Sequence, residues 1–353
     1  MCENLTLRAA TAAKLTAPEK PMTASSGASR GAIAWTRGCL LAASCGTLAS
    51  FLPAAPPAPE ASPYVLVLGT AQDGGLPQIG GRTAQDEAAR HDSSRRRAVS
   101  SLLVVEPQTG QRWLIDATPD IREQMERAEG HPANRAAAGA RPPLVDGIFL
   151  THAHMGHYLG LAQLGREAYG AQGVPVWGSA QMADFLGRNA PWDQLVRLGN
   201  IRLERFAAAQ VITLSPRLAI VPLAVPHRSE YTDTHGFALR GPNRSLLYIP
   251  DIDKWERWDR PIEEVVKITS AALLDGTFFA DGEIPGRSMA DIPHPFIAES
   301  LRRFAALPES ERRKIAFTHL NHTNPAADPA SAARKQIEAA GMRVAEDGER
   351  IDL

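Results

Sequence analysis

The stretch Thr151-His152-Ala153-His154-Met155-Gly156-His157 places three imidazole side chains within six residues. It follows the apolar run Asp146-Gly147-Ile148-Phe149-Leu150, which is typical of a buried strand. Residues two apart in an extended segment point the same way, so His152 and His154 can hold one ion while His157 turns toward a second. Imidazole is the commonest side-chain metal ligand and binds as the neutral ring. The stretch therefore predicts a metal site at a strand end rather than ordinary loop histidines.

The overall composition is that of an ordinary globular protein. The chain has 353 residues, of which 44% are hydrophobic and 22% charged, with a formal net charge of −1. Proteins that bind nucleic acids usually have a basic face, and the only basic run here, residues 95–97, is predicted to be a solvated turn. We therefore expect a small-molecule substrate and no nucleic-acid partner, and the oligomeric state stays open.

Cysteine placement restricts the kind of metal site. All three cysteines, Cys2, Cys39 and Cys45, lie near the start of the chain. The rest of the chain therefore has neither a disulfide framework nor a thiolate site. Any metal must be held by His, Asp, Glu, carbonyl oxygen or water.

Residues 1–63 are predicted to be a targeting segment followed by a linker rather than part of the fold. Arg30 and Arg37 precede a weakly apolar stretch from Gly38 to Ala55, and Pro- and Ala-rich chain follows up to residue 63. This pattern predicts a secretory signal peptide cleaved near Ala55 and export to the periplasm or the cell exterior. The stretch is too short and too often broken by Gly and Ser to predict a membrane span.

Other interpretations of this segment stay open. Leu41-Ala42-Ala43-Ser44-Cys45 is a loose lipobox, which would make the protein a lipoprotein, although the apolar run continues past Cys45. Met22 is an alternative start that would give the signal an ordinary length. The segment would otherwise be an extension without a targeting role.

Residues 64–353 are predicted to be one metal-binding domain of alternating short strands and helices. Apolar, β-rich runs predict strands at 64–69, 100–105, 113–116, 146–150, 174–177, 201–203, 218–223, 236–239, 245–249, 271–274, 314–317 and 343–345. Helices are predicted at 121–128, 159–169, 179–188, 295–305 and 329–340, the last with Asp328 as its N-cap. Residues 70–97 are predicted to be a long loop. This alternation indicates helices that cover packed sheets.

Further candidate ligands and ligand partners sit at the ends of predicted strands. A carboxylate or imidazole at such ends can converge with others on one edge of a sheet. These residues are His227, His235, His319 and His322, together with Asp116 and Asp251.

The order of these residues resembles the metallo-β-lactamase superfamily. The matching ligand positions are His152, His154, His157, His227, Asp251 and His319, with Asp116 at the first acidic position. Within that superfamily the chain most resembles the pyrroloquinoline quinone biosynthesis protein B family, in residues 68–71, 74–78, 114–122, 274–279 and 319–325. The resemblance spans about residues 64–330. It implies an α/β fold, the four-layer αββα sandwich, with metals at one edge of two sheets and a metal-bound hydroxide or oxygen species as the reactive group.

The resemblance also implies how the ligands divide. The first site would be His152, His154 and His227 with an open position, as a catalytic zinc site requires. The second would be His157, Asp251 and His319, with Asp251 able to bridge the two. Two histidines and one carboxylate also form the facial triad typical of non-haem Fe(II) oxygenases.

One position departs from the superfamily motif His-x-His-x-Asp-His, because Gly156 stands where the aspartate is expected. The lost carboxylate predicts that the second site binds metal more weakly, prefers iron or is filled by another acid. Candidates for that acid are Asp73, Asp275 and Glu283, and none of them is expected to ligate directly.

Secondary roles follow from position. Asp116 is expected to orient a ligand histidine by accepting its second N–H, and Asp251 to take part in catalysis. His322 is a candidate proton donor to a leaving group, although an ordinary loop histidine is an equal alternative. His294 is a candidate for lining the substrate cleft.

The favoured function is a metal-dependent hydrolase with one or two zinc ions that acts on an ester-type substrate, a phosphodiester or a lactone. Asp251 as a ligand favours the phosphodiesterase-like branch. The alternatives are an iron-dependent oxygenase related to pyrroloquinoline quinone biosynthesis and a non-catalytic metal- or quinone-binding protein. A Ser–His–Asp hydrolase is not supported, because the chain has no Gly-x-Ser-x-Gly elbow.

Overall fold

The computed structural model describes residues 61–129, 144–284 and 286–353. The three cysteines and both predicted cleavage sites lie outside these residues. Within them, no helix combines the length and apolar character needed to cross a membrane.

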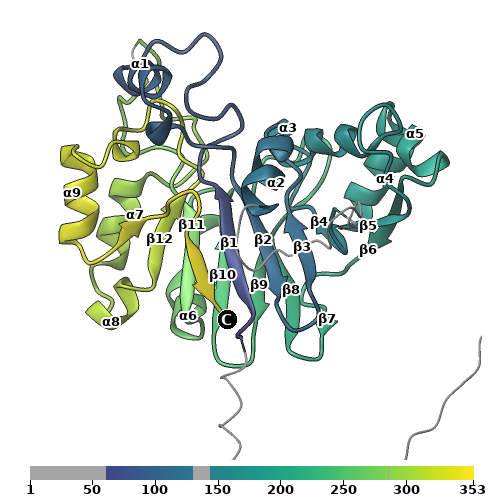
Figure 1. The fold of residues 1–353 in the computed structure, drawn as a ribbon. Helices are drawn as coiled ribbons and strands as arrows, with labels where there is room; N and C mark the ends of the chain where they lie inside the picture. The colour runs from purple at the N-terminus through teal and green to yellow at the C-terminus, as the bar shows by residue number, and fades with distance from the viewer. Residues whose placement is uncertain (1–60, 130–143, 285) are drawn as a thin grey trace, which may run out of the picture. The chain divides into compact units, whose positions relative to one another are not determined.

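Two seven-stranded sheets form the centre of the fold (Figure 1). The first contains, in spatial order, β14 (Arg350–Asp352), β1 (Tyr64–Gly69), β2 (Ser101–Glu106), β3 (Gln111–Ile115), β4 (Gly147–Phe149), β5 (Val174–Gly178) and β6 (Ile201–Arg205). The second contains β13 (Arg343–Val344), β12 (Ile315–Thr318), β11 (Ala271–Asp275), β10 (Ser245–Ile249), β9 (Thr234–Arg240), β8 (Leu218–Val225) and β7 (Ile212–Ser215).

Strand direction brings the important strand ends to one edge of each sheet. In the first sheet β3, β4, β5 and β6 run parallel, and β1 has their direction because β1–β2 and β2–β3 are both antiparallel. In the second sheet β10, β11 and β12 run parallel, and β8 shares their direction through the two antiparallel pairs that β9 makes. The loops that follow these strands therefore emerge together.

The central strands of each sheet are buried on both faces, which explains the continuous apolar runs in the sequence. In β1, Val65 and Val67 pack between the two sheets, while Leu66 and Leu68 pack under the helices of the first sheet. A strand buried on both faces loses the alternation of polar and apolar residues that marks a half-exposed strand.

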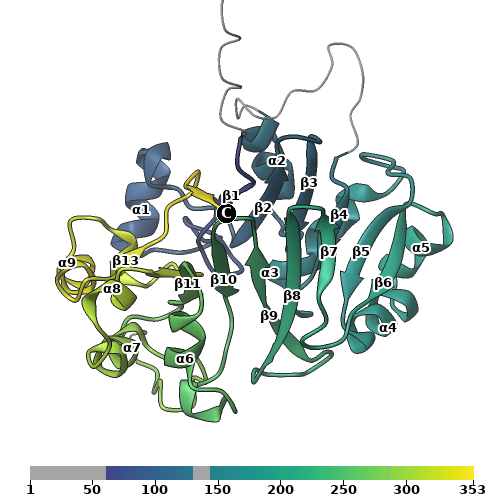
Figure 2. The same ribbon diagram turned by 90° about the horizontal axis from the view of Figure 1, so that it is seen from below.

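Helices cover the outer faces. They are α1 (Ala84–His91), α2 (Ile121–Glu129), α3 (Met155–Tyr158), α4 (Ala180–Arg188), α5 (Trp192–Arg197), α6 (Ile262–Lys267), α7 (Ile297–Phe304), α8 (Glu309–Arg312) and α9 (Ala332–Ala339). The helices α2, α4 and α5 pack on the first sheet, and α6, α7 and α9 on the second (Figures 1 and 2). The αββα sandwich predicted from the sequence is confirmed.

Two predictions in the first half of the domain were wrong, a loop at 70–97 and a helix at 159–169. The polar region 70–97 contains α1, whose N-cap Thr83 and third helical residue Asp86 form a capping box. Residues 159–169 form only a short 3-10 helix, Leu159–Leu164, followed by turns. Gly160 lies directly against the backbone of Ala117 and Thr118, so local packing there replaces a continuous α-helix.

The start of the helix predicted at 329–340 is also corrected. The structure begins α9 at Ala332, with Ser331 as its N-cap, and the Ser331 side chain accepts a hydrogen bond from the Arg334 backbone N–H at 3.0 Å. Asp328 instead accepts from the Ala330 N–H at 3.1 Å, within the turn before the helix.

Replacing Ser331 by alanine should destabilise the domain by about 1 kcal/mol, because α9 then loses the acceptor for one of its first N–H groups. Thermal unfolding should show a fall in Tm of roughly 2 °C. Asp328→Ala is the matched control and should have a smaller effect. A larger fall in Tm for Asp328→Ala than for Ser331→Ala would mean that Asp328 caps the helix.

Candidate metal centre

The predicted ligands come together at the edge where the parallel strands of the two sheets end. The histidine stretch follows β4, with His157 inside the short helix α3. His227 follows β8, Asp251 follows β10 and His319 follows β12. Strands far apart in the sequence thus deliver six side chains to one place.

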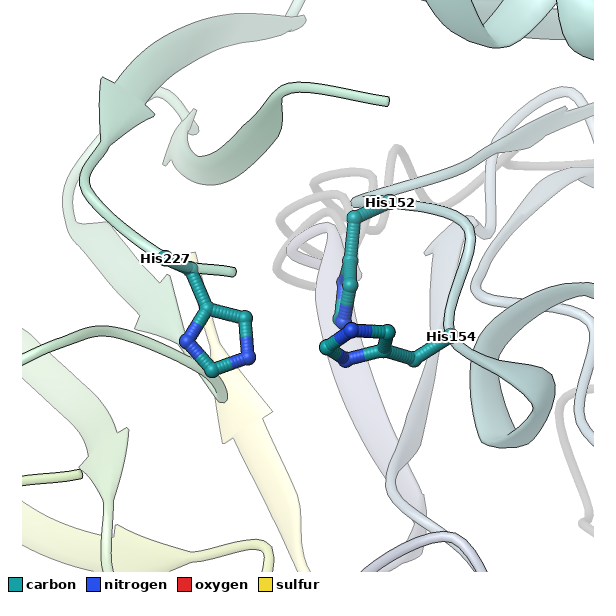
Figure 3. Close-up of side chains that lie close together, drawn as sticks. All are labelled: His152, His154 and His227. Atoms are coloured by element: carbon teal, nitrogen blue, oxygen red, sulfur yellow. The ribbon is translucent and has the colours of Figure 1, made fainter. Parts of the chain in front are cut away.

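The first group consists of His152, His154 and His227, whose ligand atoms lie within 4.8 Å of one another. Figure 3 shows the three rings facing a common space from two sides, with His227 opposite the other two. The rings of His154 and His227 are 5.0 Å apart between centroids, and those of His152 and His154 are 4.4 Å apart. These are the three residues that the sequence predicts for the first site.

The second group is centred on Asp251. Its Oδ2 lies 2.9 Å from His157 Nε2, 3.1 Å from His319 Nε2 and 3.6 Å from His152 Nε2. Its other oxygen, Oδ1, lies 3.6 Å from His227 Nε2. Because Asp251 contacts rings of both groups, it is placed to be shared between two ions.

The atoms that face this space make no hydrogen bond of regular geometry to the described residues, although His157 Nε2 and Asp251 Oδ2 lie only 2.9 Å apart. They are Nε2 of His152, His157, His227 and His319, together with Oδ2 of Asp251, and all five are buried. Buried polar atoms are normally hydrogen-bonded, so a convergent set of unpartnered ones requires an explanation. Nitrogen and oxygen donors without sulfur suit zinc, and imidazole with carboxylate also suits iron. The residues therefore fit a divalent metal ion.

The protonation states support the same interpretation. Burial lowers the pKa of His152 and His319, and lowers that of His227 to about 4, which favours neutral rings. Burial alone would raise the pKa of Asp251, but the surrounding rings, His319 foremost, hold it well below its usual value. Neutral imidazole and ionised carboxylate are the metal-binding forms.

His157 differs because two carboxylates lie against its ring. Burial lowers its pKa, but the carboxylates of Asp116 and Asp251 outweigh that effect and hold the pKa well above the usual value. The same carboxylates would favour a metal cation beside this ring.

Asp116 holds the histidine stretch in position. Its Oδ2 lies 2.8 Å from His157 Nδ1, and its Oδ1 accepts from the Thr151 N–H at 2.9 Å. Asp116 has φ 64° and His319 has φ 61°, in the left-handed region that non-glycine residues rarely adopt. Such strain concentrates at functional sites, where surrounding contacts maintain it.

Asp116→Asn should lower the affinity for the ion beside His157 by roughly 10- to 100-fold, the usual cost of removing a partner that orients a ligand. An amide oxygen and an NH₂ group cannot accept from both His157 and Thr151 as a carboxylate does. Competition with a chelator measures the affinity. Asp146→Asn is the control, since Asp146 also accepts a backbone N–H, from Arg112, at the opposite end of β4. Equal affinities in both variants would remove Asp116 from this role.

Several partners of the ligand rings were not predicted. Nδ1 of His227 lies 3.3 Å from Asp253, Nδ1 of His319 lies 3.0 Å from Thr277 Oγ1, and Nε2 of His154 lies 3.0 Å from Glu230. Asp253 follows Asp251 by two residues, which was the one signal in the sequence. The other two come from loops whose course only the fold determines.

His294, a candidate for lining the substrate cleft, lies next to the ligand cluster. Its buried ring lies 5.1 Å from that of His227, and its Nδ1 is 3.6 Å from Asp251 Oδ1. Nδ1 is also 2.8 Å from Asp275, at the end of β11. His294 and Asp275, which the sequence indicated only for secondary roles, thus form a pair beside the ligand cluster.

Other candidates lie outside the cluster. His322 Nδ1 is 2.9 Å from the buried carboxylate of Asp86, near the start of α1. His235 lies in β9, with its ring 5.1 Å from that of Phe206. Neither joins a metal-competent group within the described residues. The pairing of His322 with Asp86 supports the ordinary structural alternative for that residue.

Three acids were candidates to replace the carboxylate missing at position 156, and they lie in different surroundings. Asp275 is bonded to His294, and Glu283 accepts from the Phe279 N–H at 2.6 Å. Asp73 Oδ1 lies 3.6 Å from His157 Nε2 and groups with His157 and His319. Asp73 is therefore the one of the three whose carboxylate lies within reach of an ion beside His157 and His319, and the expectation that it does not ligate directly stays a prediction.

The site and fold agree with comparisons to known proteins. A family model described as the β-lactamase superfamily domain matches residues 111–320. Coenzyme PQQ synthesis protein B of Methylobacterium radiotolerans is 28% identical over 312 residues, which cover 82% of this chain and 99% of that protein.

Solved structures share the fold. The Zn²⁺-bound PqqB from Methylobacterium extorquens has a TM-score of 0.69 at 23% identity, covering 82% of this chain and all of that one. A diphosphatase from the PhnP family has a TM-score of 0.58 at 23% identity, covering 83% of this chain and 98% of that one. The family match spans more than half of the sequence, so this chain belongs to the metallo-β-lactamase superfamily, where it is similar to coenzyme PQQ synthesis protein B.

Proposed function

We propose that this protein is a metal-dependent hydrolase that acts on a small ester-type substrate, a phosphodiester or a lactone. The observation that carries the proposal is the convergence of four unpartnered ring nitrogens and one carboxylate oxygen in a buried space between the two sheets' strand ends. Superfamily membership supports a hydrolytic enzyme. The proposal assigns one ion to His152, His154 and His227, and a second to His157, Asp251 and His319.

The chemistry needs an activated nucleophile near neutral pH. Zinc held by these residues would supply Lewis-acid activation of water, whose pKa it lowers to about 7. The chain itself fixes the ligand geometry. Asp116, Asp253 and Thr277 lie at hydrogen-bonding distance from Nδ1 of His157, His227 and His319 respectively, so these three rings present Nε2 to the site.

The substrate has access from the side of His154. This ring is the most exposed of the histidine ligands assigned here, at 15% of its side chain, and its neighbour Met155 is 68% exposed. Tyr231, next to the Glu230 that contacts His154, is 69% exposed. Exposed apolar side chains beside a buried polar centre are suited to hold the organic part of a small substrate.

The choice of an ester-type substrate rests on two supports. Asp251 is placed to serve both ions, as the phosphodiesterase-like branch would need. A diphosphatase shares the fold, which is compatible with phosphoryl-group chemistry, although a shared fold supports only a class of chemistry.

Metal analysis of protein purified anaerobically without added metal tests the proposal. We expect close to two zinc ions per chain and turnover in a screen of phosphodiesters and lactones. Protein that takes up no metal, even after reconstitution, would contradict it. Two ions without turnover of any ester would favour a metal- or quinone-binding protein instead.

An iron-dependent oxygenase is the second candidate. The specific observation in its favour is that His157 and His319 meet Asp251, a set of two histidines and one carboxylate. This candidate predicts one iron per chain and oxygen consumption that stops when His157 or His319 is replaced by alanine. Zinc content with ester turnover would exclude it.

For residues 1–63 we propose a signal peptide and linker that lead to export, with residues 64–353 as one domain. N-terminal sequencing of exported protein tests this assignment. A new terminus just after Ala55 supports an ordinary signal, and a lipid-modified Cys45 supports a lipoprotein. An intact N-terminus in the cytoplasmic fraction would contradict both.

A further inference from the structure

We infer that Asp73, in the loop after β1, supplies the carboxylate that the histidine motif lacks at position 156. It would complete the second ion position beside His157 and His319. The inference rests on the proposed two-ion centre and assigns one more ligand to it.

The geometry around Asp73 is that of a ligand. Its Oδ1 lies 3.6 Å from His157 Nε2, and the ligand atoms of Asp73, His157 and His319 all lie within 4.8 Å of one another. This oxygen is buried and has no hydrogen-bond partner among the described residues, although the side chain as a whole is 37% exposed. The oxygen that faces the two rings is thus shielded from solvent.

Gly156 and Asp73 compete for the same volume. A Cβ atom placed on Gly156 would overlap Asp73 Oδ1, and would lie 2.7 Å from Asp73 Cα and 2.9 Å from its Cγ. Contacts this short do not occur in folded proteins, so only glycine at 156 permits Asp73 to approach. The departure from the superfamily motif therefore accompanies an acid that fills the same corner from a different loop.

The loop that carries Asp73 is fastened to the segment that carries His319. The backbone N–H of Gln72 donates to Leu320 O at 2.8 Å, and the N–H of Leu320 donates to Thr70 O at 2.8 Å. Gly75, with φ 69°, turns the chain so that its own N–H donates to Gln72 O at 2.8 Å. These bonds hold Asp73 and His319 in a fixed relation, as a preorganised ligand pair requires.

The assignment changes the expected character of the second position. With Asp73 included, two carboxylates and two rings surround it, which compensates the charge of a divalent cation. The weaker binding predicted from the loss of the motif aspartate is then no longer expected. The facial triad also gains a second carboxylate, which weakens the argument for iron.

Asp73→Asn tests the assignment with zinc as the probe. We expect the affinity for the second zinc ion to fall at least about 10-fold while that for the first is unchanged, measured by competition with a chelator. Cobalt substitution gives an independent readout, because the absorption bands of the second ion should change with its coordination. Glu283→Gln is the matched control. It removes one carboxylate whose oxygens are bonded to the Phe279 N–H and to Thr323, and it should leave both affinities as they are.

The Gly156→Asp variant tests whether the second ion position already has its carboxylate from Asp73. If Asp73 fills it, a new aspartate collides with Asp73, and the affinity for the second ion stays flat or falls. A rise in that affinity, or an Asp73→Asn variant that binds both zinc ions as tightly as the wild type, would overturn the inference and leave the two-ion centre standing. A wild-type chain that binds fewer than two zinc ions would overturn the centre itself, and the inference with it.

Discussion

Replacing Asp251 by alanine should reduce kcat/KM by roughly 10³-fold and weaken the binding of both metal ions. Asp251 is 2% exposed and lies within 3.6 Å of five histidine rings, those of His152, His157, His227, His294 and His319. Metal-assisted stabilisation of a transition state is worth several kcal/mol, and each 1.4 kcal/mol or so is a factor of ten in rate. Loss of the shared carboxylate should remove most of this stabilisation.

The measurement has two parts. Zinc content after dialysis should fall below that of the wild type, and kcat/KM should be compared on the ester substrate found by screening. Asp259→Ala is the control, because it makes the same substitution at an exposed acid eight residues further along the chain. Circular dichroism should show both variants folded. An Asp251→Ala variant that kept its zinc and its activity would exclude Asp251 from the centre.

The sequence predicted well where a local pattern carries the information. The continuous apolar run of β1 and the strand before the histidine stretch were both identified, because burial on two faces leaves little room for polar residues. Asp116, Asp251 and His319 were found by a geometric rule, since parallel strands end at one edge. The rule does not predict the left-handed backbone of Asp116 and His319, which tertiary contacts impose.

The sequence failed where the fold joins distant loops. The proximity of Asp73 to His157 depends on the β1 loop crossing the start of α3, and no spacing along the chain encodes it. The pairing of His294 with Asp275 likewise joins residues of two separate segments at the sheet edge. Spacing rules apply within an element or between adjacent strands, but these contacts join separate loops.

The helix errors have a different cause. In α1 two of eight residues, Asp86 and Ala89, are buried, so apolar periodicity is almost absent. The Thr83 and Asp86 capping box was the usable signal. For α9, a proline after an acidic residue suggested an earlier start, but Ser331 competes for the same capping role and prevails. Local propensity allowed both starts, and the surrounding structure selected one.

Replacing both His152 and His154 by alanine should remove one metal ion per chain and abolish measurable turnover. The first group then keeps only His227, and a single imidazole does not hold zinc against a chelator, because stable zinc sites use three or four protein ligands. The second group retains His157, Asp251 and His319, so its ion should stay bound. Metal analysis should therefore report a fall from two ions to about one, rather than to none.

The pattern across variants separates two ions from one. If both groups served a single ion, the double variant and Asp251→Ala would lose metal to the same extent. With two ions, the double variant loses one, while Asp251→Ala weakens both. His322→Ala is the control for histidine removal, since His322 contacts Asp86 rather than the cluster, and it should keep both ions. Unchanged metal content in the His152→Ala/His154→Ala variant would mean that these rings do not bind metal, however closely they converge.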